Sequence, residues 1–167
     1  FGELGFISSN KNPTYDIDIA LKKGYYLGEP YDQLNLAILL QSGVMHIDDI
    51  SMTRDTSMGF QLSGTLPLKN SNKKKSMVSL VTTYKDLSMP MIHELIPNFY
   101  KIEGRATGNL KLFGSLDETK FEFNTIVNDA VFDRIFLGDI SSKGSYNDNY
   151  LNIDYAKPET STHFRFL

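Results

Sequence analysis

The sequence predicts an all-β fold of mainly antiparallel strands with one short helix. Apolar and polar residues alternate with a period of two in segment after segment, which is the pattern of half-buried strands. Turn-forming residues separate these segments at intervals of about 8 to 12 residues. Only one segment has helical spacing. We therefore expect about ten to twelve strands in a sandwich, a barrel or an extended sheet.

The N-terminal segments show the alternation clearly. In residues 14–24, Ile17, Ile19 and Leu21 would share one face of a strand, and Asp18 would lie on the other. The strands expected in this part of the chain are 14–24, 33–40, 44–52, 59–66 and 77–84. Their further inward-facing candidates are the apolar residues Leu34, Leu36, Ile38, Leu40, Phe60 and Leu62.

A helix is expected only at Met91–Ile96, where apolar residues recur at helical spacing. Pro90 suits its first turn and Pro97 ends it. The polar residues 69–76 form the most linker-like stretch, and they divide a single domain, 1–167, into repeat-like halves at 1–70 and 77–167. The three lysines within this stretch are either a solubilising loop or a contact for anionic head groups.

The C-terminal segments return to strand periodicity. Strands are expected at 108–116, 120–127, 132–137, 139–146, 150–155 and 163–167. Their inward-facing candidates are Leu110, Leu112, Phe121, Phe123, Leu151 and Ile153.

Turns are expected where glycine, serine, asparagine and aspartate gather between strands. The expected sites are Lys23–Gly24, Ser42–Gly43, Ser57–Met58–Gly59, Ser115 with Asp117–Glu118, and Asn147–Asp148–Asn149.

Residue types that carry out chemistry are scarce in this pattern. The chain has no cysteine, no G-x-S-x-G elbow and no phosphate-binding G-x-x-x-x-G-K-[ST] loop. His93–Glu94 begins an H-E-x-x-H motif, but Pro97 stands at the second histidine position. Asp16 and Asp18 match the solvated face of a strand better than an acid/base pair. We expect no catalytic residue, no metal and no cofactor, and hence a protein that is not an enzyme.

The charge balance argues against a nucleic-acid partner. The net charge is −3, and the positive residues are dispersed apart from the single lysine cluster. A surface that neutralises phosphates is therefore not expected.

The two halves match each other when the sequence is shifted along itself. A shift of 50 positions places Leu62–Ser–Gly–Thr–Leu over Leu112–Phe–Gly–Ser–Leu, and a shift of 106 places Tyr15–Asp–Ile over Phe121–Glu–Phe. The matches preserve strand face and turn position more than residue identity. An internal repeat and general β periodicity both account for them.

The motif G-x-x-x-G-x-L-x-L-x-G-S-L at Gly104–Leu116, with the helical segment before it and the alternating segments after it, resembles the repeating unit of TamB/AsmA-like proteins of diderm bacterial envelopes. Residues 24–52 followed by GFQLSGTLPL look like another form of this unit. The resemblance covers most of the chain from Tyr15 onward. It implies a fragment of a longer repetitive protein, anchored in the inner membrane, whose curved, open, groove-like sheet crosses the periplasm.

The resemblance also implies a function in outer-membrane assembly, as a hydrophobic groove that binds and conducts phospholipid. The expected partners are phospholipid acyl chains, adjoining repeats of the same chain and outer-membrane assembly proteins. Acyl chains would gain about 0.8 kcal/mol per buried methylene in such a groove. The twelve inward-facing candidates above, with Ile17, Ile19 and Leu21, would line it. The alternative is a β-rich structural or adhesion module with a packed core and a protein partner.

Overall fold

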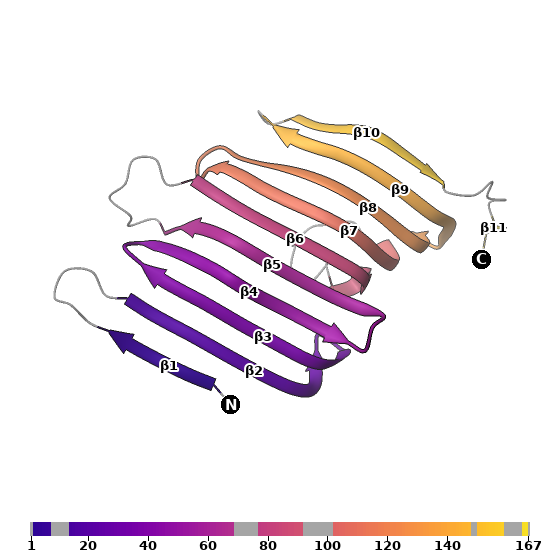
Figure 1. Ribbon diagram of the computed structural model, residues 1–167. Helices are drawn as coiled ribbons and strands as arrows, with labels where there is room; N and C mark the ends of the chain where they lie inside the picture. The colour runs from indigo at the N-terminus through magenta and orange to yellow at the C-terminus, as the bar shows by residue number, and fades with distance from the viewer. Residues whose placement is uncertain are drawn as a thin grey trace.

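The computed structural model describes residues 2–7, 14–68, 77–91, 102–147, 150–158 and 165–166, and it is almost entirely β-sheet (Figure 1). The strands are β1 (Gly2–Ile7), β2 (Thr14–Tyr26), β3 (Glu29–Gln41), β4 (Val44–Arg54), β5 (Met58–Pro67), β6 (Met77–Ser88), β7 (Ile102–Ser115), β8 (Thr119–Phe132), β9 (Ile135–Asn147), β10 (Tyr150–Pro158) and β11 (Arg165–Phe166). The predicted all-β class is confirmed, and the described residues contain eleven strands, within the predicted range of ten to twelve.

The strands form one antiparallel sheet in which each strand from β1 to β10 pairs with the next along the chain. β11 is the exception, because it pairs with β9 at Phe136 and Ile135, beyond the stretch of β9 that β10 occupies. Since β5 pairs with β6, strands from both repeat-like halves belong to the same sheet.

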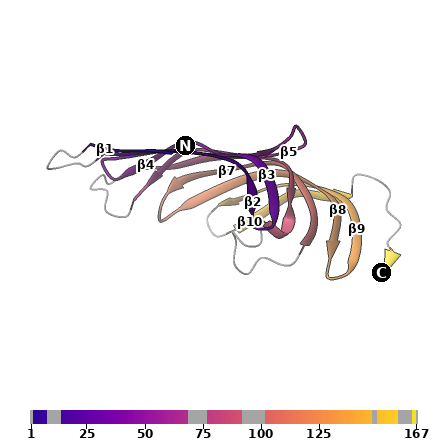
Figure 2. The same cartoon turned by 90° about the horizontal axis from the view of Figure 1, so that it is seen from below.

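The sheet is open and bent (Figure 2). Among the described residues no second sheet packs on either face, because all eleven strands belong to one sheet. Figure 2 shows the helical residues 89–91 on the inner side of the bend. The curved sheet with one short helical piece that the sequence predicts is therefore confirmed, and its inner side is identified by the helix.

Two predicted strands, 132–137 and 139–146, are wrong as separate elements. Phe132 ends β8, and the turn is formed by Asp133 and Arg134, whose φ angles are 44° and 69°. β9 then runs without a break from Ile135 to Asn147. Gly138 resembles a strand breaker in the sequence, but it sits within β9 where the pairing with β8 shifts register, so it marks a bulge.

The turn predicted at Lys23–Gly24 is also wrong, since β2 continues to Tyr26 and the chain turns at Leu27–Gly28. Gly24 lies beside Tyr31 on β3: a Cβ atom at position 24 would lie 2.5 Å from the Tyr31 hydroxyl oxygen, so a larger residue would displace the end of that side chain. The predicted Ser57–Met58–Gly59 turn lies slightly earlier, at 55–57. The Ser42–Gly43 turn is confirmed, with φ angles of 52° and 75°.

The predicted helix begins before the expected residue, because residues 89–91 are already helical and Pro90 lies among them. The rest of the predicted range falls in 92–100, outside the described residues. Four other features of the sequence also lie outside the described residues: His93–Glu94, the lysine cluster at 73–75, Asp148–Asn149 and His163. In the part of the chain that the structure describes, no helix has the length and apolarity needed to cross a membrane.

The buried core is small and lies toward one end of the strands. Its cluster consists of Met52, Met58, Leu87 and Met91, and the partly buried residues packed against it are Tyr31, Leu34, Phe60 and Tyr84. We call this region the closed end. The accessible surface of 11843 Å² exceeds the roughly 8,300 Å² expected of a compact monomer of this mass. The fold therefore buries less of its total surface than a compact monomer of this mass does.

Candidate functional site

The strand register gathers the predicted groove residues on one side of the sheet. Residues paired directly across an antiparallel sheet point to the same face. One row of paired positions crosses the sheet as Ile19, Leu36, Ile50, Leu62, Thr82, Leu110, Phe123, Gly144 and Ile153. A second row runs through Ile17, Ile38, Ile47, Gly64, Leu80, Leu112, Phe121, Tyr146 and Leu151.

The remaining predicted residues fall in two further rows. A third row contains Leu21, Leu34, Met52, Phe60, Tyr84, Gly108 and Thr125. A fourth, shorter row contains Tyr15, Leu40, Met45 and Leu66. All fifteen predicted positions thus occupy the four rows, which we call the apolar face.

The apolar face is the inner face of the bent sheet. Met91 belongs to the helical residues on the inner side of the bend, and its cluster includes Met52 of the third row (Figure 2). Leu34 and Phe60 of the same row pack against that cluster. The concave side therefore carries the apolar residues, and we call it the trough.

Most of the trough is uncovered. Leu21 is 44% exposed and Ile153 is 55% exposed, whereas Met52 in the closed end is 2% exposed. The other predicted groove residues whose side chains the structure describes are half-buried. Half-buried leucine and isoleucine side chains in adjoining rows form a floor that a hydrocarbon chain can cover.

Small residues beside aromatic residues shape this floor. A Cβ atom on Gly144 would lie 2.8 Å from the Phe123 ring, and one on Gly108 would lie 2.2 Å from the backbone oxygen of Asn124. Tyr84 pairs with Gly108, and its hydroxyl lies 2.5 Å from Thr125 Oγ1 on the strand beyond. Tyr84 therefore reaches across β7 at Gly108, a position that carries no side chain.

Tyr84 is a site residue that the sequence analysis missed. Burial raises the pKa of its phenol, and the hydrogen bond with Thr125 acts in the opposite direction. The phenol is therefore neutral at physiological pH, and it gives the trough a single paired polar contact at this position. Its place in an alternating strand was visible in the sequence, but its partner two strands away was not.

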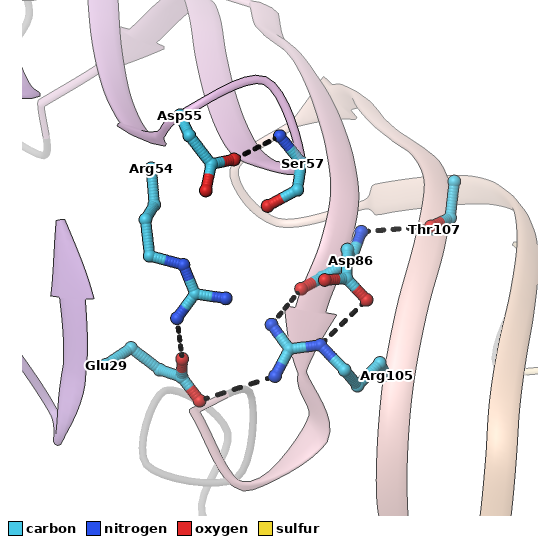
Figure 3. Close-up of polar contacts among 7 residues, drawn as sticks. All are labelled: Glu29, Arg54, Asp55, Ser57, Asp86, Arg105 and Thr107. Carbon is cyan, nitrogen blue, oxygen red and sulfur yellow. Dashed lines mark hydrogen bonds and ion pairs between the residues drawn. The ribbon is translucent and has the colours of Figure 1, made fainter. Parts of the chain in front are cut away.

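A polar network crosses the closed end of the trough (Figure 3). Glu29 on β3 lies 3.6 Å from Arg54 Nη1 through its Oε2 and 3.8 Å from Arg105 Nη1 through its Oε1. Arg105 Nε donates to Asp86 Oδ1 at 2.7 Å, and its Nη2 donates to the Asp86 carbonyl oxygen. The Asp86 amide donates to Thr107 Oγ1 at 3.0 Å.

The Glu29–Arg105 ion pair joins strands that are not neighbours. In a flat sheet, the four intervals from β3 to β7 would separate these strands by roughly 19 Å. The 3.8 Å contact therefore requires the sheet to curl at this end. In Figure 2 the ends of β2 and β3 bend toward the inner side, which agrees with this contact.

The outer face carries a polar network on β3 to β5, while Val81 and Ile126 on the same face are 44% and 38% exposed. Ser51 donates to Asp49 at 2.7 Å, and Asn35 and Gln61 donate to Ser51 and Asp49 respectively. A shallow depression of about 390 Å³ is lined by Ser51, Thr53, Gln61, Thr83 and Lys85, together with Gly59, Phe60 and Tyr84. The sequence analysis did not foresee this depression, and it offers no paired carboxylates for hydrolytic chemistry.

The described residues contain no metal-binding cluster. No group of three or more histidine, cysteine or acidic side chains lies close enough to hold a metal ion among the residues with a defined position. Asp16 and Asp18 are exposed on β2, as expected for a solvated strand face. His46 is half-buried in β4 opposite Leu39 and Thr65.

Comparison of the chain with protein-family models, with curated proteins and with solved structures finds no match.

Proposed function

We propose that this protein is a segment of a hydrophobic-groove protein that binds phospholipid acyl chains in its trough and conducts them between the inner and outer membranes of a diderm bacterium. The observation that carries the proposal is the apolar face, whose first two rows cross the sheet from β2 to β10 and whose described side chains are mostly half-buried on the concave side. The proposed location is the periplasm. No covalent chemistry is assigned to the protein.

The energetics support a hydrocarbon ligand. Each methylene that leaves water for the trough contributes about 0.8 kcal/mol, so a few contacted methylenes already give measurable affinity. Phospholipid head groups would remain in water along the open side, because the trough offers few polar partners. The Tyr84–Thr125 pair is neutral, so a hydrocarbon chain that covers it does not have to remove water from a charged group.

The proposal accounts for the single-layer architecture. A structural or adhesion module with a packed core would need a second layer over the apolar rows, because uncovered leucine and isoleucine do not stabilise a fold. Adjoining repeats that continue the sheet, and outer-membrane assembly proteins, are the proposed protein partners. They would extend the trough and need not cover it.

The test is to purify the protein, extract it with organic solvent and identify phospholipid by mass spectrometry. A folded, lipid-loaded protein is expected, with loading lost in Leu112→Asp. Lys111→Asp, on the outer face of the same strand, is the matched control because it also introduces an aspartate and should keep the lipid. A folded protein that yields no lipid and binds no fluorescent fatty acid would contradict the proposal and favour the protein-partner module.

A further inference from the structure

The tip of the β2–β3 hairpin, residues 24–31, covers the closed end of the trough. Tyr31 packs against the cluster of Met52, Met58, Leu87 and Met91. Figure 2 shows that the ends of β2 and β3 bend toward the inner side, where this cluster lies. Tyr31 of the hairpin tip therefore helps to bury this cluster.

Within the part of the chain that the structure describes, two ion pairs of Glu29 hold the hairpin tip in this position. Glu29 lies 3.6 Å from Arg54 and 3.8 Å from Arg105. These distances exceed the 2.7–2.9 Å that is typical of a charge-assisted hydrogen bond. Glu29 is 18% exposed, so it is largely shielded, yet it is held by attraction rather than by tightly aligned hydrogen bonds.

Arg105 is fixed independently of Glu29. Its Nε lies 2.7 Å from Asp86 Oδ1, and its Nη2 donates to the Asp86 carbonyl oxygen. The arginine is thus anchored between β6 and β7, while its remaining donors face Glu29. Loss of the Glu29 contact would release the hairpin tip and leave the arginine in place.

An irregular backbone position lies at the base of the hairpin tip. Lys23 has a φ of 54° inside β2, a conformation that non-glycine residues rarely adopt. Ladder pairing passes from Lys22–Gln33 to Gly24–Tyr31 around it. Rotation at this irregular position would move residues 24–31 without breaking the pairing of the longer arm of the hairpin.

We propose that residues 24–31 are a flap over the closed end of the trough and that the Glu29–Arg105 ion pair is its latch. Opening the flap uncovers the methionine cluster, which is continuous with the third row of the apolar face. The use of this opening for acyl chains rests on the proposed function, whereas the movement of the flap does not.

The movement is tested by distances between paired spin labels measured with pulsed electron paramagnetic resonance. The chain contains no cysteine, so labels attach only at introduced positions. Tyr25→Cys, at a residue that is 78% exposed, and Glu103→Cys on β7 report on the flap. Gln41→Cys and Lys111→Cys, on exposed positions of β3 and β7, report on the opposite end.

Glu29→Gln is expected to shift the 25–103 distances to longer, broader values and to leave the 41–111 distances unchanged. Glu122→Gln, which makes the same charge change on exposed β8, should alter neither pair. Raising sodium chloride to about 1 M should produce a smaller shift in the same direction in the protein with native Glu29, because the Debye length is then about 3 Å but a partly buried charge is screened less than an exposed one. This salt measurement uses the protein with native Glu29, so it does not depend on whether the Glu29→Gln variant folds.

The latch is overturned if folded Glu29→Gln keeps the original 25–103 distances, if salt has no effect on them, or if both label pairs lengthen equally. The last result would indicate loosening of the whole sheet. Because the protein is measured without added lipid, absence of phospholipid in the extract would remove the proposed function and leave the latch standing. Conversely, if the protein carries lipid but the flap does not move, only the latch proposal is contradicted.

Discussion

The closed end and the rest of the trough are built from the same kinds of side chain but differ in how they are covered. At the closed end, Met52 is 2% exposed beneath the hairpin tip and the helical residues. Along the first row, Leu36 and Leu62 are only half-buried because no described element lies over them. The same apolar composition therefore stabilises the fold in one region and remains available to a ligand in the other.

Apolar residues therefore have different roles at the closed end and along the uncovered part of the trough. Substitutions at the closed end should act on the free energy of unfolding. Substitutions along the uncovered rows should act mainly on binding. The largest difference between the two regions is expected for removal of a buried methionine.

Met52→Ala is expected to lower the free energy of unfolding by about 2–5 kcal/mol, because it leaves a cavity in the small core. Leu36→Ala, its counterpart on the uncovered floor, should cost less than half as much, because its side chain is only partly removed from water. Urea denaturation followed by circular dichroism measures both. Equal losses would mean that Leu36 lies in a core as dense as that around Met52.

Gly108→Ala is the next largest change, and we expect a loss of about 1–3 kcal/mol from overpacking. The added Cβ atom would lie 2.2 Å from the Asn124 backbone oxygen, so the β7–β8 pairing must adjust. Gly28→Ala is a control for a glycine in open space, since no atom lies within 4 Å of its Cβ position, although its φ of 84° adds local strain. Thermal denaturation of both variants should show the lower midpoint for Gly108→Ala.

Tyr84→Phe tests the polar contact between β6 and β8. Removing the hydroxyl breaks the 2.5 Å contact with Thr125, and the expected loss is about 0.5–1.5 kcal/mol. Thr125→Val should cost a similar amount, and the double variant should cost less than the sum of the two. Strict additivity in this double-mutant cycle would show that the two side chains do not interact in solution.

Leu112→Asp should have the smallest effect on stability while abolishing lipid loading. A charge placed on an uncovered floor can stay hydrated, so we expect the free energy of unfolding to change by less than about 1.5 kcal/mol. In a packed core the same unpaired charge would unfold the protein. Chemical denaturation together with mass spectrometry of the extract separates these outcomes. An unfolded Leu112→Asp variant would show that Leu112 lies in a packed core like that of the closed end.

Period-two alternation was sufficient to predict which residues share a face within each strand, because the side-chain face follows directly from residue parity, whereas the four rows depend on the register between strands. The residues expected inside, from Ile17 on β2 to Ile153 on β10, share rows once neighbouring strands pair in register. Strand ends were less predictable. Gly24 and Gly138 look like turn residues, yet one accommodates Tyr31 and the other sits at a bulge.

The contacts at the closed end could not be predicted from the sequence. Glu29 and Arg105 are 76 residues apart along the chain, and they meet only because the sheet curls across four strand intervals. The Asp133–Arg134 turn was missed because aspartate and arginine carry no strong hairpin signal, although both adopt positive φ angles. Curvature accumulates over many strands, whereas the sequence pattern reports on each strand separately.

The unbroken rows impose a rule on how this chain can change length. Adding a single residue to one strand would send every later side chain of that strand to the opposite surface, placing charges among the leucines. Insertions in pairs preserve the alternation, and an odd residue requires a local bulge to absorb it. The register shifts between Ile47 and Ile50 and between Tyr84 and Leu87 are such corrections. Strands should therefore lengthen or shorten by even numbers of residues, or gain a bulge, so that one face of the sheet remains apolar.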